Sequence, residues 1–138
     1  MEAVNIRLKE KYTQITLNEQ ASEGYLLEDA EIVLVAFGTV SRICRAVVEK
    51  ARQLGIPAGL FRPITLWPFP AEELKRTTGK AKCFLSVEMN MGQMVEDVQL
   101  TINGRAPVYH YGRLGGMVPV ARDVLQEVQK LYSGGVVK

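Results

Sequence analysis

The sequence predicts an α/β fold with a mostly parallel sheet, and three stretches carry that prediction. Residues 31–37 are predicted to form a strand, in which 32–37 is an unbroken apolar and β-branched run typical of a central parallel strand buried on both faces. Apolar residues then recur at helical spacing over 40–54, which predicts a helix with one buried face. Residues 82–103 repeat this order, with a short apolar run at 83–87 followed by a second helical stripe. Strands that alternate with helices in this way predict parallel strands joined by crossover helices.

The first segment, residues 3–20, predicts a polar helix with one narrow apolar stripe. The stripe consists of Val4, Leu8, Tyr12 and Ile15. Such a helix must lie on something, either its own domain or a neighbouring one. We expect residues 1–21 to be a linker helix from a preceding domain that this sequence lacks, and residues 22–138 to be one α/β domain.

The next elements follow from local signals. A short extended piece is expected at 25–27. Thr39 or Ser41 can cap the helix at 40–54, and Gly55 can end it in a left-handed conformation. A strand at 58–62 completes a strand–helix–strand unit.

Three prolines then break regular structure over 62–70, around the single tryptophan, Trp67. A short helix is predicted at 71–77. After the helical stripe of 91–102, a last strand at 107–111 and a glycine-rich loop lead to a final helix at 119–132.

Size, charge and cysteine content limit the class of protein. A chain of 138 residues is about one domain, and 47% apolar with 23% charged residues is ordinary for a globular protein. A net charge of +2 is too balanced to predict a nucleic-acid or membrane surface. We expect no nucleic-acid partner, no membrane association and a cytoplasmic location. Cys44 and Cys83 are both predicted to be small buried apolar residues.

A search for catalytic residues finds little. The only histidine, His110, lies between two tyrosines in a predicted strand, where a packed or surface role is more common than that of a general base. There is no Gly-x-Ser-x-Gly turn for a hydrolase and no spacing that fits a metal. We therefore assign no catalytic, cofactor-binding or metal-binding residue.

Two places could bind an anion. Gly38 and Thr39 open a helix directly after a strand, where backbone N–H groups are free. Arg113 lies in the glycine-rich loop 112–116. The three glycines of a dinucleotide-binding fingerprint are missing, and the loop also fits an ordinary sharp turn.

Two loops could contact a partner. Glu88, Asn90 and Gln93 lie where a strand ends and a helix begins, so they either cap that helix or orient a partner. Trp67, which follows Arg62 in the proline-rich loop, is either packed under the sheet edge or exposed as an interface anchor.

Three segments together resemble one protein family. They are residues 59–70 (GLFRPITLWPFP), 87–98 (VEMNMGQMVEDV) and 111–119 (YGRLGGMVP). They resemble the C-terminal domain of the alpha subunit of 2-oxoacid:ferredoxin oxidoreductases, and the 2-ketoisovalerate (branched-chain) type above all. The likeness extends over essentially the whole chain. Residues 120–123 depart from the Thr-Pro-Glu-Glu run expected there, which affects only the start of the last helix.

The resemblance implies a three-layer α/β/α domain of the transketolase C-terminal type. It also implies an enzyme that oxidatively decarboxylates a 2-oxoacid, forms an acyl-coenzyme A and passes electrons to ferredoxin. Thiamine diphosphate, magnesium and iron–sulfur clusters would be bound in other domains and subunits, and two cysteines are too few for a cluster with four thiolate ligands.

We therefore expect this chain to be a non-catalytic scaffold domain, inactive on its own. Its partners would be the remainder of the alpha subunit, the beta and further gamma or delta subunits, and ferredoxin through the whole complex, with a homodimer as a further option. Arg62, Trp67, Glu88, Asn90 and Gln93 are the candidate interface residues. The alternative is a regulatory module that binds an anion or coenzyme A through Gly38, Thr39 and Arg113.

Overall fold

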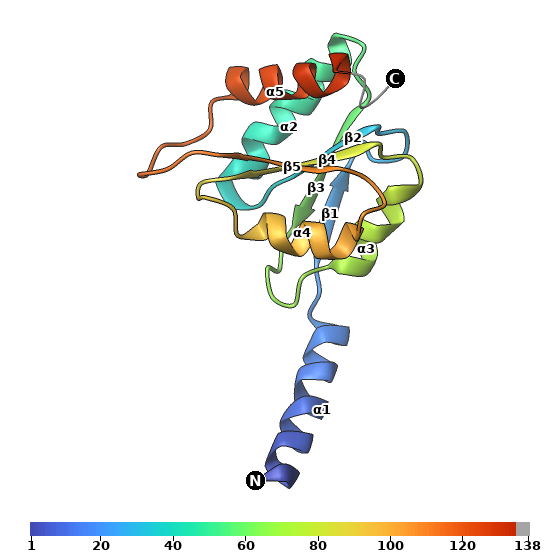
Figure 1. The fold of residues 1–138 in the computed structure, drawn as a ribbon, viewed down its shortest axis with the longest axis vertical. Helices are drawn as coiled ribbons and strands as arrows, with labels where there is room; N and C mark the ends of the chain where they lie inside the picture. Colours follow the sequence, from blue (N-terminus) through green and yellow to red (C-terminus); the bar gives the residue numbers. More distant parts are fainter. Residues whose placement is uncertain (135–138) are drawn as a thin grey trace.

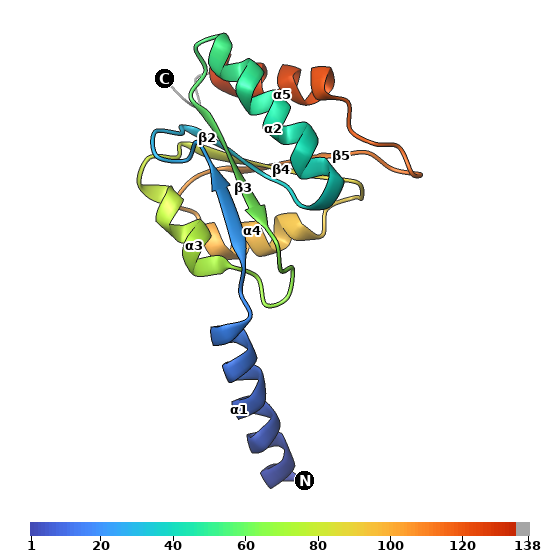
Figure 2. The same cartoon turned by 180° about the vertical axis from the view of Figure 1, so that it is seen from behind.

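The computed structural model describes residues 1–134, and within them a five-stranded sheet lies between two pairs of helices (Figure 1). The strands are β1 (Ser22–Tyr25), β2 (Ile32–Val35), β3 (Ala58–Pro63), β4 (Cys83–Glu88) and β5 (Val108–Gly112), in the order β1-β3-β2-β4-β5. All neighbouring pairs are parallel except β1 and β3, which are antiparallel (Figure 2). The mostly parallel α/β sheet predicted from the sequence is confirmed. The extended piece expected at 25–27 lies slightly earlier, in β1.

The helices form the two outer layers of the fold. Helices α2 (Gly38–Gln53) and α5 (Ala121–Ser133) cover one face of the sheet. Helices α3 (Ala71–Arg76) and α4 (Met94–Ile102) cover the other face, and a 3₁₀ turn, Thr77–Gly79, follows α3. No helix of residues 1–134 combines the length and the apolar character needed to cross a membrane.

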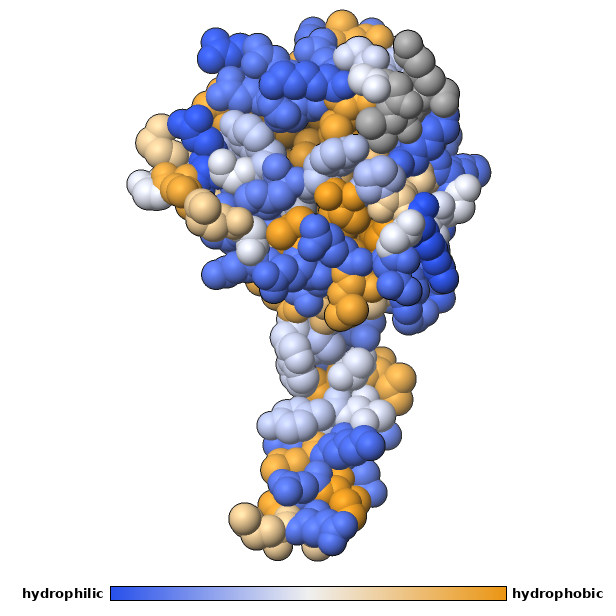
Figure 3. Space-filling model, in the orientation of Figure 1, coloured by the Kyte–Doolittle hydropathy of each residue, from blue (hydrophilic) through white to orange (hydrophobic). Residues whose placement is uncertain are grey.

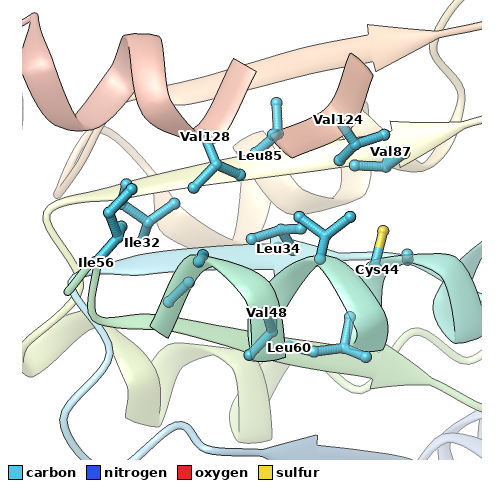
Figure 4. Close-up of a cluster of buried hydrophobic side chains, with 14 of the residues drawn as sticks. Ile32, Leu34, Cys44, Val48, Ile56, Leu60, Leu85, Val87, Val124 and Val128 are labelled. Carbon is cyan, nitrogen blue, oxygen red and sulfur yellow. The ribbon is translucent and has the colours of Figure 1, made fainter. Parts of the chain in front are cut away.

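Strand β2 lies at the centre of both apolar cores. Ile32 and Leu34 point toward α2 and α5, where they meet apolar residues of both helices and of the neighbouring strands (Figure 4). Val33 and Val35 point to the opposite face, toward α3 and α4. All four β2 side chains are fully buried, which confirms that the unbroken apolar run marks a central strand.

Helix α2 buries most of the predicted stripe, but Leu54 at its end is 51% exposed, and the helix begins differently from our expectation. Its buried apolar residues are Val40, Cys44, Val47, Val48 and Ala51. The helix begins after Phe37, and no side chain of residues 1–134 caps it, so the capping role predicted for Thr39 or Ser41 is wrong. The Ser41 hydroxyl instead donates to the Gly38 carbonyl oxygen at 2.6 Å. Gly55 does adopt a left-handed conformation, with φ at +79°.

Helix α1 (Glu2–Asn18) extends away from the rest of the domain and buries no residue (Figure 1). Its apolar stripe is largely open, with Val4 49% and Tyr12 50% exposed. Tyr12 makes an edge-to-face ring contact with Trp67, at a centroid distance of 5.8 Å. The structure therefore does not show the helix packed along its own domain.

Candidate functional site

The strand order places a crevice between the carboxyl ends of β2 and β4. Helix α2 leads from β2 to β3 over one face of the sheet, and α4 leads from β4 to β5 over the other face. The chain thus diverges between two adjacent parallel strands, which is where open α/β sheets usually bind ligands or partners. A cavity of about 210 Å³ opens there, and its lining includes Phe37, Leu66 and Asp97. Glu88, Asn90 and Gln93, which the sequence predicted as one group, line the same cavity.

The Glu88 carboxylate forms its hydrogen bonds within the domain. The side chain is wholly buried, and its two oxygens accept hydrogen bonds from the backbone N–H groups of Gln93 (3.1 Å), Met94 (2.7 Å) and Val95 (3.1 Å). Because these are the free N–H groups of the first turn of α4, Glu88 caps that helix. Of the two roles considered for this residue, the structure supports capping, and the burial leaves no carboxylate surface for a partner.

The capping also explains where α4 begins. The sequence pattern placed Met91 on the buried face of this helix, but that prediction is wrong, since Met91 is 80% exposed. Gly92 has φ at +109°, and the helix starts only at Met94. The Asn90 side chain stabilises this turn by accepting a hydrogen bond from the Gly92 N–H at 2.8 Å.

Two polar side chains complete the surroundings of Glu88. The Ser86 hydroxyl donates to Glu88 Oε2 at 3.0 Å, and His110 Nε2 lies 3.6 Å from the same oxygen. His110 reaches this position because its Cα pairs with that of Ser86 across β4 and β5. The ring packs against Gly112, where an added Cβ would lie 2.6 Å from the His110 Cε1 atom. Sequence reasoning missed this cluster, because register between neighbouring strands is not visible in a single stretch of sequence.

The crevice is acidic. Partial burial raises the pKa of Asp97, and the nearby carboxylates of Glu96 and Glu88 raise it further. Amide groups of Asn90 and Gln93 line the cavity together with Asp97. Such a lining suits a cationic or amide-bearing side chain of a partner and repels an anion.

Trp67 is not packed under the sheet edge. It is 63% exposed, and its neighbour Leu66 is 45% exposed. The loop is held by Thr65, whose hydroxyl donates to the Pro68 carbonyl oxygen at 3.0 Å and accepts from the Ala21 N–H at 3.0 Å. Arg62 lies away from the crevice, where its Nη1 pairs with Glu23 Oε2 of β1 at 2.9 Å.

Exposed apolar side chains follow three parallel strands at the same edge of the sheet. We call them the carboxyl-edge patch: Leu66 and Trp67 after β3, Met89 and Met91 after β4, and Leu114, Met117, Val118 and Val120 after β5. The loop after β5 extends out from the domain, and Figure 3 shows apolar surface at its tip. Apolar groups concentrated in this way are typical of a protein–protein contact surface.

The cysteines and the residues predicted to bind an anion do not form a common site. Cys44 and Cys83 are buried as predicted, and burial raises the pKa of their thiols to about 12 and about 11. Gly38 and Thr39 form the first turn of α2, whereas Arg113 follows β5, which is separated from β2 by β4. Within residues 1–134 there is no group of three or more His, Cys, Asp or Glu side chains placed to hold a metal.

Comparison with known proteins identifies relatives along almost the whole chain. Residues 30–124 match the family described as pyruvate:ferredoxin oxidoreductase core domain II. The chain is 44% identical to the ketoisovalerate oxidoreductase subunit VorB of Methanothermobacter thermautotrophicus, over 95% of this chain and 37% of that protein. It is 34% identical to the 2-oxoglutarate synthase subunit KorA of Methanothermobacter marburgensis, over 73% of this chain and 27% of that protein.

Solved structures share the fold at lower identity. A 2-oxoglutarate:ferredoxin oxidoreductase from Magnetococcus marinus superposes with a TM-score of 0.77 and 17% identity, over 94% of this chain and 23% of that one. A split-gene transketolase gives a TM-score of 0.68 and 20% identity, over 84% of this chain and 42% of that one. These likenesses confirm the three-layer fold of the transketolase C-terminal type. The chain spans little more than a third of the VorB relative's length.

Proposed function

This chain belongs to the pyruvate:ferredoxin oxidoreductase core domain II family, and we propose that it is the C-terminal domain of the alpha subunit of a 2-ketoisovalerate:ferredoxin oxidoreductase. The observation that carries the proposal is the 44% identity to a ketoisovalerate oxidoreductase subunit over 95% of the chain. The whole enzyme would oxidatively decarboxylate a branched-chain 2-oxoacid to an acyl-coenzyme A and reduce ferredoxin, in the cytoplasm.

Within that enzyme, the domain would act as a non-catalytic scaffold. The buried Glu88 carboxylate is occupied by three backbone N–H groups, and both thiols are buried with raised pKa values, so these groups serve the fold. An iron–sulfur cluster needs four thiolate ligands, and the two cysteines do not fit one. Thiamine diphosphate, magnesium and the clusters would be held by other domains and subunits.

The carboxyl-edge patch would be the contact surface toward the remainder of the alpha subunit and the beta subunit. Trp67 is its largest exposed side chain, and large exposed aromatic residues often anchor interfaces. The acidic crevice beside it could receive a basic side chain of the partner. Helix α1, with its open apolar stripe and its ring contact between Tyr12 and Trp67, would connect this surface to the preceding domain.

Reconstitution tests the scaffold role. The chain would be combined with the rest of the alpha subunit and the beta subunit, and 2-ketoisovalerate-dependent reduction of a viologen dye would be measured with and without it. We expect the chain to be retained in a pull-down and activity to need it. Equal activity without the chain would contradict a scaffold needed for the reaction.

Trp67→Ala tests the contact surface. We expect it to weaken association by roughly tenfold or more, because it removes a buried anchor from the interface. The melting temperature of the chain alone should hardly change, since Trp67 is mostly exposed. Leu100→Ala is the matched control, because Leu100 is 79% exposed but lies on α4, outside the patch. If Trp67→Ala lowered the melting temperature by several degrees while assembly stayed intact, the result would contradict the interface role.

A further inference from the structure

A second cavity, of about 190 Å³, lies on the α2 side of the sheet, between that helix and strands β1 and β3. Three arginines line it: Arg42 and Arg45 from α2, and Arg62 from β3. Leu60 and Tyr25 supply apolar walls. Neither the predicted anion residues nor the carboxyl-edge patch accounts for this concentration of guanidinium groups.

Glu23 of β1 also lines the cavity, but the carboxylates at and near it do not balance these charges. Arg62 pairs with Glu23 at 2.9 Å, and Arg45 lies 3.7 Å from Glu49 while stacking over the Tyr25 ring at 4.1 Å. Arg42, in contrast, has no ion-pair partner among residues 1–134. One positive charge at the cavity is therefore left without a counterpart.

A buried hydrogen-bond donor also lacks a partner. The Nε atom of Arg62 is inaccessible to solvent, and it donates to no group of the described chain. A buried donor left without an acceptor is unfavourable, and such groups are rare in native proteins. Because Arg62 lines the cavity, an acceptor oxygen held there would be close to this side chain.

Helix α2 adds to the positive potential. Ser41, in its first turn, also lines the cavity. That turn contains no acidic side chain, and no side chain of the described residues caps it. The positive end of the helix dipole is therefore not neutralised from within the helix.

We propose that this arginine cavity binds a small oxyanion of the phosphate class, either free phosphate or the terminal group of a phosphate ester. Planar guanidinium groups bind phosphate oxygens through paired, charge-assisted hydrogen bonds, and the Ser41 hydroxyl and the apolar walls would limit the size of the anion. The cavity lining does not include Gly38, Thr39 or Arg113, although Ser41 lies in the same first turn of α2 as Gly38 and Thr39. The proposal does not depend on the scaffold role.

The test is a titration of the ¹⁵N-labelled 138-residue chain with sodium phosphate at constant ionic strength, followed by NMR chemical shifts. We expect saturable shifts centred on Ser41, Arg42 and Arg62. A parallel titration with glycerol 3-phosphate distinguishes the two sources, because tighter binding of the ester would identify a phosphate ester as the preferred ligand.

Two variants and one matched control locate the site. Arg42→Gln should weaken phosphate binding by roughly tenfold or more, since it removes a charge-assisted hydrogen bond. Arg62→Lys keeps the charge beside Glu23 but removes the planar guanidinium and its paired donors, and it should also weaken binding. Arg7→Gln, at an exposed arginine of α1 with no ion pair within residues 1–134, should leave binding unchanged. If Arg62→Lys fails to fold, Arg42→Gln alone decides.

Three outcomes would overturn the proposal. Phosphate shifts that do not saturate at tens of millimolar would show that no site exists. An equal loss in Arg42→Gln and Arg7→Gln would indicate general charge attraction. A loss in Arg113→Gln with binding intact in Arg42→Gln would place the anion at the glycine-rich loop instead.

Discussion

Helices α2 and α4 begin in equivalent places, yet the backbone N–H groups of their first turns have different surroundings. Each follows a central parallel strand and starts at the same edge of the sheet. The first N–H groups of α4 are bound by the buried carboxylate of Glu88. The first turn of α2 contains no acidic side chain, and no side chain within residues 1–134 caps it. A cavity lined by three arginines lies beside it.

This difference shows how one sheet edge can present two opposite surfaces. At α4, the Glu88 carboxylate binds the N-terminal N–H groups of the helix, and the crevice beside it is acidic. The N-terminus of α2 keeps its positive potential, and three arginine side chains lie near it. A helix N-terminus is therefore informative about ligands only after its internal partners have been counted.

Removal of Glu88 should have the largest effect. We expect Glu88→Ala to lower the free energy of unfolding by about 3–5 kcal/mol, because it leaves buried N–H groups without an acceptor and creates a cavity. Urea unfolding followed by circular dichroism measures this loss. Glu96→Ala, which removes an exposed acid from the same turn, should change stability by less than about 1 kcal/mol. Similar losses in the two variants would contradict the capping role.

The packing around His110 gives the next largest effect. In Gly112→Ala, the new Cβ would collide with the Asn90 carbonyl oxygen and lie 2.6 Å from the His110 ring. We expect a loss of about 1–3 kcal/mol from this overpacking. Gly79→Ala is the control, since a Cβ there meets nothing within 4 Å, and its unfolding midpoint should hardly move. A wild-type midpoint in Gly112→Ala would show that the β4–α4 loop adapts freely.

An acidic side chain introduced in the first turn of α2 should neutralise the positive end of that helix, as acidic side chains do in α4. Thr39 is exposed in the first turn, so Thr39→Asp should stabilise the domain by about 0.3–1 kcal/mol through the helix dipole. Phosphate binding to the arginine cavity should weaken at the same time. Gln53→Asp, at the last residue of the same helix, should destabilise instead. A stabilising effect at both ends would mean that the dipole is not the cause.

The two thiols should give the smallest effect at neutral pH, and they report on both regions, Cys44 in α2 and Cys83 in β4. In the folded chain their pKa values are raised to about 12 and about 11, against 9.0 for an ordinary thiol. The unfolded chain therefore loses these protons first as pH rises, so stability should fall above about pH 9 and be unaffected below it. Ellman's reagent should not react at pH 8 until the chain unfolds. Fast reaction of Cys44 alone would indicate that α2 opens locally.

The sequence by itself determined the fold class and the position of most elements. The unbroken apolar run of β2 and the helical stripe of α2 need no distant information, because burial on both faces or on one face is encoded in the local order of residues. The three segments that resemble the 2-oxoacid:ferredoxin oxidoreductases likewise led to the family that the comparisons confirm. Grouping Glu88, Asn90 and Gln93 was also possible, since they are neighbours along the chain.

Only the tertiary structure decided what those side chains do. Glu88 meets His110 because β4 and β5 pair in one register, and Arg62 meets Arg42 because β3 lies beneath α2. Met91 follows the helical spacing, but the Glu88 cap and the left-handed Gly92 start the helix after it. Periodicity records which face of an element is apolar, whereas charge clusters and caps arise from residues that are distant in sequence and adjacent in space.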